Sequence, residues 1–365
     1  MSRLLHVQRT DGKPGQVYYP INIKHVPIPT VGPNQLLVRM DAAALNHKDL
    51  FIRRHLYPAI SFENPLLADG YGTVVQVGAA VSQQNKQLLL HKPVLINPMS
   101  GWESDPEAPD GHGSVLIIGA SKMTQMGCGQ DYALVHEEDV VPAPAHLSAV
   151  EGAALPLAGL TGWRALVTKS RNAEAGRNIL VTGIGGGVAL QVLQFAVAMG
   201  CHVYVTSGDE AKIERAKTMG ARAGVVYARE GWEMELKALL PQERPFVDAV
   251  IDGAGGDIVA KACKVLKPGG VIAQYGMTAG PKMEWTMQAV LMNIELRGST
   301  MGSRREFKDM VAFVDKNKIR PVVSKTVQGL GNLDGIEELF RDMDAGAQFG
   351  KLVIEIDDRP SSPKL

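Results

Sequence analysis

The sequence predicts an α/β protein in which a doubly wound parallel sheet is joined to a partly open β-barrel. Two observations support this fold class. From about residue 151, short apolar runs alternate with helical stretches, a rhythm typical of a parallel sheet with helices on both faces. Before about residue 150, short β-rich runs at irregular spacing are separated by Pro and Gly, which favours a barrel over a parallel sheet.

The barrel part contains four candidate strands, and a fifth lies near the end of the chain. The four are residues 35–40, 72–77, 92–96 and 132–135. After residue 295 the pattern becomes mixed again, and residues 351–356 (KLVIEI) predict a closing strand that returns to the first domain.

The sheet part contains five buried strands separated by helices. The predicted strands are residues 178–182, 202–206, 223–226, 247–251 and 270–274. The predicted helices are residues 153–167, interrupted by Pro156 and Gly159, then 188–199 and 210–219. Asp252, at the end of a buried strand, is expected to cap the turn that follows it.

Composition and charge exclude several classes of protein. With 365 residues, 45% hydrophobic and 21% charged, the chain is typical of a globular protein with sizeable cores. Lys and Arg number 38, as do Asp and Glu, and no long basic run indicates nucleic acid or an anionic membrane. A small neutral ligand, or one carried by a cofactor, is the better expectation.

The ends of the chain and its cysteines bear on location. Three widely spaced cysteines indicate reduced thiols, and neither a signal peptide nor an apolar run of about 18 residues is present. We therefore expect a soluble, cytoplasmic protein. The final Pro363-Lys364-Leu365 differs from the peroxisomal Ser-Lys-Leu address only at its first position, and we favour a frayed tail over that address.

A glycine cluster between the strand at 178–182 and the following helix indicates a dinucleotide. Its members, Gly183, Gly185, Gly186, Gly187 and the following Val188, form a strand-to-helix turn. Small residues there let the backbone approach a pyrophosphate at a helix N-terminus. Val188 stands where the third glycine of the motif is expected, so either the helix packs with more separation or Ala189 takes that place. A tight turn without a ligand is the less favoured alternative.

The end of the second strand favours NADPH over NADH. An NAD enzyme usually carries an acid there to bind the ribose 2′-hydroxyl, whereas this strand ends at Ser207, with Lys212 five residues on. A hydroxyl and an ammonium donate to a 2′-phosphate that a carboxylate would repel. Asp209 and Glu210 nearby keep NADH open as an alternative.

Seven short motifs occur along the chain: residues 46–49 (NHKD), 57–58 (YP), 68–72 (ADGYG), 160–166 (LTGWRAL), 183–188 (GIGGGV), 266–270 (LKPGG) and 349–351 (FGK). In their order and spacing they resemble the medium-chain dehydrogenase/reductase superfamily, and within it the zinc-independent quinone oxidoreductase-like branch. The resemblance covers nearly the whole chain. It implies a GroES-like catalytic domain from residues 1–150 and 299–365, and a Rossmann dinucleotide-binding domain from residues 151–298.

The resemblance also implies that the catalytic zinc is absent. Asn46 stands at the place of the family's zinc-binding cysteine and Ala68 at that of the histidine, and the four-cysteine structural lobe is missing. His47 alone cannot supply the three or four ligands that zinc needs. Without a Lewis acid, a conjugated enone or a quinone is an easier hydride acceptor than a simple ketone.

By the same resemblance, Asn46 and Thr161 are expected near the nicotinamide, and Tyr57 near the substrate as a hydrogen-bond or proton donor. Ser207, Lys212 and Tyr227 are expected around the 2′-phosphate, and Lys351 near the cofactor. The implied protein is an NADPH-dependent reductase of quinones or α,β-unsaturated carbonyls, acting as a homodimer.

Two rival functions stay open. One is an enoyl-thioester reductase, for which Arg304 and Arg305 are the only local basic pair available to receive a phosphopantetheine arm. The other is a non-catalytic NADPH-binding sensor. The segment 99–130 matches the family least, so the substrate is not identified by the resemblance.

Overall fold

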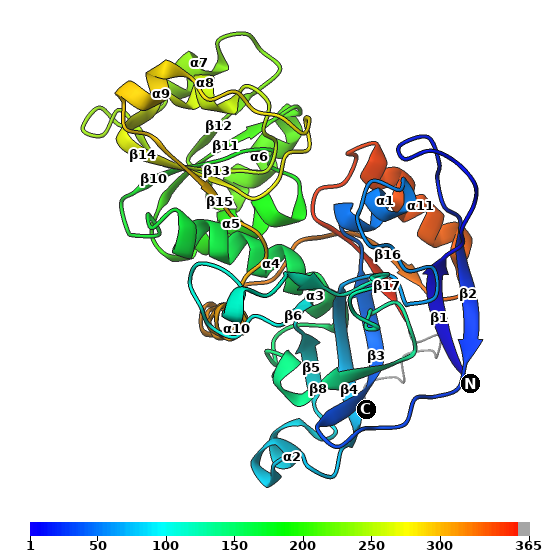
Figure 1. Ribbon diagram of the computed structural model, residues 1–365. Coiled ribbons are helices and arrows are strands. Elements are labelled where there is room, and N and C mark those ends of the chain that lie inside the picture. The colour runs from blue at the N-terminus through cyan, green and yellow to red at the C-terminus, as the bar shows by residue number, and fades with distance from the viewer. Residues whose placement is uncertain (357–365) are drawn as a thin grey trace. The chain divides into compact units, whose positions relative to one another are not determined.

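The computed structural model describes residues 1–356, apart from the side chain of His112. Pro363-Lys364-Leu365 lies outside the described residues. The chain divides into two compact units, Met1–Leu157 with the segment from Ser303 onward, and Ala158–Gly302 (Figure 1). We call them the barrel unit and the sheet unit. Within residues 1–356, the helices are all too short or too polar to cross a membrane.

The sheet unit contains six parallel strands in the order β12-β11-β10-β13-β14-β15. They are β10 (Asn178–Val181), β11 (His202–Ser207), β12 (Ala223–Val226), β13 (Val247–Asp252), β14 (Leu266–Gln274) and β15 (Glu295–Gly298). The five predicted strands are confirmed. The sequence did not predict β15, because this edge strand is largely exposed and carries no buried apolar run.

Helices cover both faces of this sheet, as the alternation of strands and helices predicts. Figure 1 shows α5 on one face and α7, α8 and α9 on the other. The helices are α4 (Pro156–Trp163), α5 (Gly187–Ala198), α6 (Glu210–Thr218), α7 (Trp232–Ala238), α8 (Ile258–Ala262) and α9 (Met287–Leu291). The predicted helix at 153–167 is divided, because Pro156 starts a new helix and residues Arg164–Lys169 form a π-helical turn.

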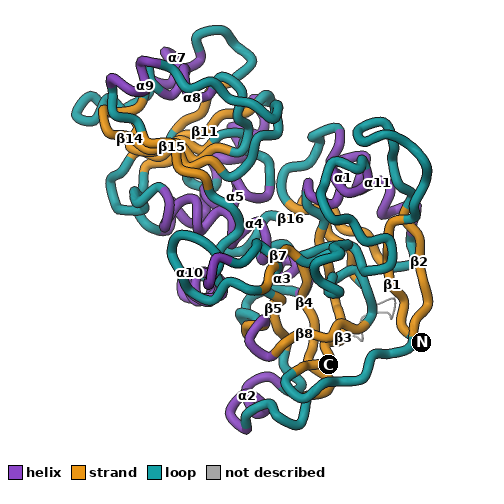
Figure 2. Tube along the Cα trace, viewed as in Figure 1, coloured by secondary structure: helices purple, strands orange, loops and turns teal. Residues whose placement is uncertain are grey.

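The barrel unit is built on a sheet of order β16-β17-β3-β4-β5-β9, with β8 also paired to β3 (Figure 2). Its strands are β3 (Gln35–Ala44), β4 (Asp69–Val77), β5 (Pro93–Ile96), β8 (Tyr132–His136), β9 (Val140–Pro142), β16 (Val323–Gln328) and β17 (Lys351–Glu355). The closing strand is confirmed, because β17 pairs antiparallel with β3 and places Val353 opposite Ala44.

Smaller elements surround this barrel sheet. A separate antiparallel pair joins β1 (Ser2–Val7) to β2 (Ile21–Val26). The remaining helices are α1 (His47–Arg53), α2 (Gln83–Leu89), α3 (Ala149–Ala153), α10 (Arg304–Asn317) and α11 (Leu333–Asp344). The segment 99–130 has little regular structure beyond β6 (Met99–Ser100) paired with β7 (Leu116–Ile117).

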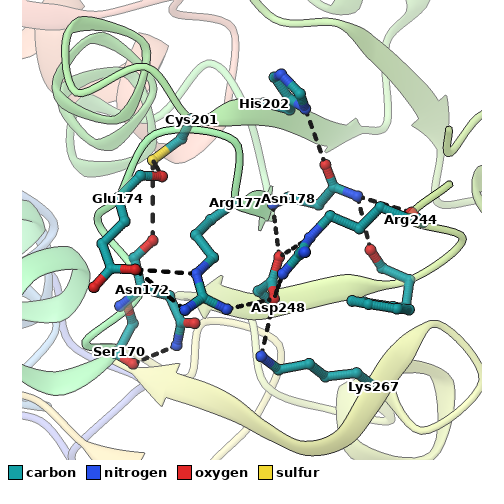
Figure 3. A network of polar contacts seen from close by, with 11 residues as sticks. Ser170, Asn172, Glu174, Arg177, Asn178, Cys201, His202, Arg244, Asp248 and Lys267 are labelled. Atoms are coloured by element: carbon teal, nitrogen blue, oxygen red, sulfur yellow. Dashed lines mark hydrogen bonds and ion pairs between the residues drawn. The ribbon is translucent and has the colours of Figure 1, made fainter.

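A buried carboxylate, Asp248 on β13, holds the amino ends of the neighbouring central strands β10 and β14 together (Figure 3). It accepts hydrogen bonds from the backbone N–H of Asn178 at 2.8 Å and from Arg244 Nε at 2.9 Å, and Lys267 Nζ lies 2.9 Å away. Burial alone would raise the pKa of Asp248, but these donors outweigh it and lower the pKa to about 2.

Replacing Asp248 by Asn is expected to lower the free energy of unfolding by about 2–3 kcal/mol, because Arg244 and Lys267 lose their charged acceptor. Since the folded pKa is depressed from 3.8 to about 2, the native contribution is complete above about pH 4 and is lost as the pH falls toward 2. Urea unfolding of both proteins at pH 7 and pH 3 tests this. A difference between them that does not shrink at pH 3 would contradict the assignment.

Candidate functional site

The glycine turn of the sheet unit has a backbone that requires glycine. Gly183 has φ +63° and Gly185 has φ +118°, both in the region that L side chains rarely adopt. Helix α5 follows with Gly186 as its N-cap, and a glycine has no side chain to accept from the first N–H groups of the helix. These features fit a pyrophosphate at the helix N-terminus.

The position of the missing third glycine is taken by a small buried residue. Ala189 is 1% exposed, whereas Val188 before it is only partly buried. Of the two registers that the sequence left open, this burial favours Ala189 as the residue of close helix packing.

A buried polar cluster fixes the carboxyl ends of β13 and β14 beside this turn. Asp252 Oδ2 accepts from the Gly255 amide at 2.7 Å and from Gln274 Nε2 at 2.6 Å. Thr182, immediately before Gly183, donates its hydroxyl to Asp252. The predicted capping role of Asp252 is confirmed, and its bond to Thr182 also anchors the glycine turn.

Two of the three residues expected around a 2′-phosphate, Ser207 and Tyr227, lie together in the corner where the second strand ends. Ser207 is buried, and its hydroxyl donates to the Ile184 carbonyl at 3.4 Å and accepts from the Asp209 amide at 3.1 Å. Tyr227 follows β12, is half exposed, and donates its amide to the Ser207 carbonyl at 3.0 Å. Lys212 lies in the first turn of α6, the helix that follows β11.

Arg229, which follows β12 near this corner, was not predicted from the sequence as a candidate residue. It lies two residues after Tyr227, is half exposed, and pairs with Glu210 at 3.3 Å and Glu235 at 3.7 Å. The sequence signal that could have identified Arg229 is its basic side chain, so soon after the third strand of the sheet unit. Asp209, the nearby acid, caps α6 by accepting from the Ala211 amide at 2.9 Å.

The barrel unit brings Asn46, Asp69 and Lys351 together in one buried cluster. Lys351 Nζ lies 2.8 Å from Asp69 Oδ2 and 2.7 Å from Asn46 Oδ1. Asn46 Nδ2 donates to Asp69 Oδ2 at 2.9 Å. The third bond of the ammonium goes to the Leu45 carbonyl at 2.7 Å, so all of its N–H groups are bonded inside this unit.

A second buried pair lies next to this cluster. Asp49 Oδ2 accepts from the backbone N–H of Asn46 at 2.8 Å, and Lys48 Nζ lies 3.8 Å from Asp49 Oδ1. Lys48 also donates to the Gly119 carbonyl at 2.7 Å, which ties the segment 99–130 to α1. Its ammonium lies 5.6 Å from the centroid of the Tyr57 ring. Burial, and then the charge of Asp49, raises the pKa of Tyr57.

Thr161 belongs to the sheet unit, on α4. It is 6% exposed, and its hydroxyl lies 3.8 Å from the sulfur of Met301.

The residues at the family's zinc positions do not fit a zinc ion. Asn46 offers an amide, Ala68 offers no ligand atom, and Asp69 is already paired with an ammonium. A divalent ion there would face the Lys351 charge and lack the three or four ligands it requires. Residues 1–356 also contain no group of three or more His, Cys, Asp and Glu side chains arranged to hold a metal.

Arg304 and Arg305, the basic pair suggested for a thioester arm, do not form an exposed basic site together. Arg304 is 13% exposed and lies between carboxylates, with Glu138 at 3.2 Å and Asp139 at 2.9 Å, and it also pairs with Glu103. Only Arg305 is exposed. The first arginine therefore holds the segment near residue 103 to α10.

Comparisons with known proteins identify the family. Models described as "Alcohol dehydrogenase GroES-like domain" and "Zinc-binding dehydrogenase" match residues 32–145 and 187–316. A zinc-type alcohol dehydrogenase-like protein of Leptosphaeria maculans is 54% identical over 347 residues, covering 94% of this chain and 97% of its own. The crystal structure of an NAD-dependent alcohol dehydrogenase is similar with a TM-score of 0.82 at 29% identity, covering 97% of this chain and all of its own.

Two further relatives are reductases of conjugated substrates by name. A 2-methylene-furan-3-one reductase of Solanum lycopersicum is 29% identical, covering 90% of this chain and 74% of its own. A crotonyl-CoA reductase of Streptomyces collinus is 25% identical, covering 84% of this chain and 76% of its own. With a GroES-like barrel unit and a Rossmann-like sheet unit that belongs to a nicotinamide-binding fold, this chain is an oxidoreductase of the medium-chain dehydrogenase/reductase superfamily.

Proposed function

We propose that the protein is an NADPH-dependent, zinc-independent reductase that delivers hydride to quinones or α,β-unsaturated carbonyls. The observation that carries the proposal is the Lys351 ammonium, bonded to Asn46 and Asp69 where a catalytic zinc would need ligands. A simple ketone requires a Lewis acid or a strong acid at its oxygen, whereas a conjugated acceptor delocalises the charge and needs only hydrogen bonds and a later proton.

The chain supplies binding groups and a proton donor for this reaction. NADPH, when bound, would supply the hydride. Gly183, Gly185, Gly186, Gly187 and Val188 would hold its pyrophosphate. Asn46 and Thr161 are proposed near the nicotinamide, and Tyr57 near the substrate. A phenol is protonated at neutral pH, and burial raises the pKa of Tyr57 further, so its hydroxyl is present as a donor.

The preference for NADPH rests on the corner after β11. Ser207 replaces the acid of NAD enzymes, and the nearby Asp209 is engaged as a helix cap. Lys212, Tyr227 and Arg229 are the groups that we propose around the 2′-phosphate. Titration of the protein with NADPH and with NADH, followed by nicotinamide fluorescence, tests this preference. Tighter or equal binding of NADH would reject it.

A substrate panel separates the proposed function from its two rivals. The panel contains a quinone, an enone, a crotonyl thioester and a simple ketone, each with NADPH. We expect turnover of the quinone or the enone and little of the ketone. Preference for the thioester would instead favour the activity named for the Streptomyces relative. NADPH binding without turnover of any acceptor would favour a sensor.

The edge of the parallel sheet supports a homodimer. Strand β15 is the last strand of the sheet, and Leu296 on it is 40% exposed. Met287 and Leu291 on the preceding α9 are 70% and 75% exposed. An open strand edge with apolar neighbours is a ready pairing surface.

Replacing Leu296 by Glu is expected to convert a dimer into a monomer, because like charges would face each other across the paired edges. Light scattering after size exclusion measures the mass, and Glu295→Gln is the matched control on the same strand. A wild-type protein that is monomeric at micromolar concentration, or a Leu296→Glu protein that remains dimeric, would contradict the proposal.

We also propose a cytoplasmic location, in keeping with free thiols at Cys128, Cys201 and Cys263. Imaging a fluorescent fusion with and without the last three residues distinguishes this from a peroxisomal address.

A further inference from the structure

The side-chain amide of Asn46 is held between opposite charges. Its oxygen accepts from the Lys351 ammonium and its nitrogen donates to the Asp69 carboxylate, at 2.7 and 2.9 Å. An ammonium can only donate and an ionised carboxylate can only accept. Flipping the amide would place oxygen against oxygen and N–H against N–H. The two charges therefore fix which end of the amide is the donor.

Strand pairing brings Lys351 and Asp69, which lie in distant parts of the chain, next to Asn46. Lys351 is the first residue of β17, which pairs with β3, and the Leu45 amide after β3 donates to the Leu352 carbonyl at 2.9 Å. Asp69 is the first residue of β4, and its second oxygen accepts from the Leu157 amide at 2.6 Å. Because Lys351 is 5% exposed and Asp69 is fully buried, solvent screens this arrangement little.

One N–H of the Asn46 side-chain amide has no hydrogen-bond acceptor within the part of the chain that the structure describes. The nitrogen carries two hydrogens, and among residues 1–356 the only acceptor for them is Asp69. Asn46 is 8% exposed. A buried N–H left without an acceptor costs roughly 1–3 kcal/mol, so native proteins rarely keep one unless it has a role.

We propose that Lys351 and Asp69 are positioning residues that hold this spare N–H of Asn46 as a donor to the carbonyl oxygen of the substrate. The inference rests on the proposed reduction of a conjugated carbonyl. Negative charge moves to that oxygen as the β-carbon accepts hydride, and a donor fixed in advance stabilises it without reorganisation. The ammonium on the amide oxygen also polarises the amide and strengthens the N–H as a donor.

Kinetics of Lys351→Met and Lys351→Arg test this role. We expect kcat for an enone to fall roughly 10- to 100-fold in Lys351→Met, since loss of a whole oxyanion donor costs about 100- to 1000-fold. The dissociation constant of NADPH should stay near the wild-type value, and Lys351→Arg should recover part of kcat. Lys325→Met, on neighbouring β16 and paired at the surface with Glu338 and Asp342, is the matched control. Unchanged kcat in Lys351→Met, or a loss confined to NADPH binding, would overturn the inference.

The double variant Lys351→Met/Asp69→Asn distinguishes loss of the positioning role from simple misfolding. It removes both charges, so no buried ion is left unpaired, but the Asn46 amide is free to flip. We expect it to fold and to keep a low kcat. Recovery of the wild-type kcat in the folded double variant would overturn the positioning role.

A signal that does not depend on turnover separates this inference from the proposed function. The ¹⁵N-bound amide protons of Asn46, assigned by their loss in Asn46→Ala, should shift when cyclohexenone is added to the wild type with NADP⁺. The shift should disappear in Lys351→Met. If the shift occurs but no enone is reduced, the proposed function fails and the donor role stands. If enone is reduced and the Asn46 signals do not move, the donor role alone is overturned.

Discussion

Replacing Asp69 by Ala is expected to lower the free energy of unfolding by about 3–5 kcal/mol, the usual cost of breaking a buried ion pair by removing one partner. The carboxylate is fully buried and accepts from Lys351, from Asn46 and from the Leu157 amide. Its loss leaves an ammonium uncompensated in the interior, together with two donors. Urea denaturation followed by circular dichroism measures the change.

An exposed ion pair in the same unit provides the control for this stability prediction. Arg54 and Asp344 pair at the surface, where both side chains are at least one-third exposed. Asp344→Ala should therefore change the free energy of unfolding by less than about 1 kcal/mol. A loss in Asp69→Ala no larger than that in the control would show that the buried cluster is not held as described.

Replacing Gly185 by Val is expected to weaken NADPH binding about 100-fold. Gly185 has φ +118°, so a β-branched side chain would force the backbone of the turn into another conformation. The first N–H groups of α5 would then no longer face the pyrophosphate, and strain of about 1–3 kcal/mol per residue would add to the loss. Fluorescence titration with NADPH measures the affinity.

Gly176→Val separates backbone strain from ligand binding. Gly176 also has a positive φ, +79°, and lies in the turn before β10, with open space around it. Both variants should lower the melting temperature, but only Gly185→Val should weaken NADPH binding. Wild-type affinity in Gly185→Val would mean that this turn does not hold the dinucleotide.

The parts of the fold that repeat a local pattern are predictable from the sequence. The apolar run and glycine cluster that begin at Asn178 place β10, its turn and α5 close to their observed bounds. The edge strand β15 was missed, since an exposed strand carries no buried run. The π-helical turn at Arg164–Lys169 was missed as well, because it continues the periodicity of the helix before it.

The candidate site depends on contacts that periodicity does not encode. Lys351 and Asp69 are separated by 282 positions, and they meet because β17 and β4 both pair with β3, each in one particular register. The sequence pointed to Lys351 through its motif and suggested a contact with the cofactor. Its three bonds inside the barrel unit give the residue a different proposed role, in positioning Asn46. Lys48 was not identified, because its significance comes from its bond to the Gly119 carbonyl, 71 positions away. Arg229 was missed although its place shortly after a predicted strand was a usable signal.

Turnover by the metal-free enzyme tests whether hydride transfer is independent of zinc. The protein is dialysed against a strong zinc chelator, its metal content is verified by elemental analysis, and oxidation of NADPH is followed with an enone in excess. We expect a rate equal to that of the untreated enzyme and a saturated ketone as product. An activity that disappears with the metal and returns with one equivalent of zinc would contradict it.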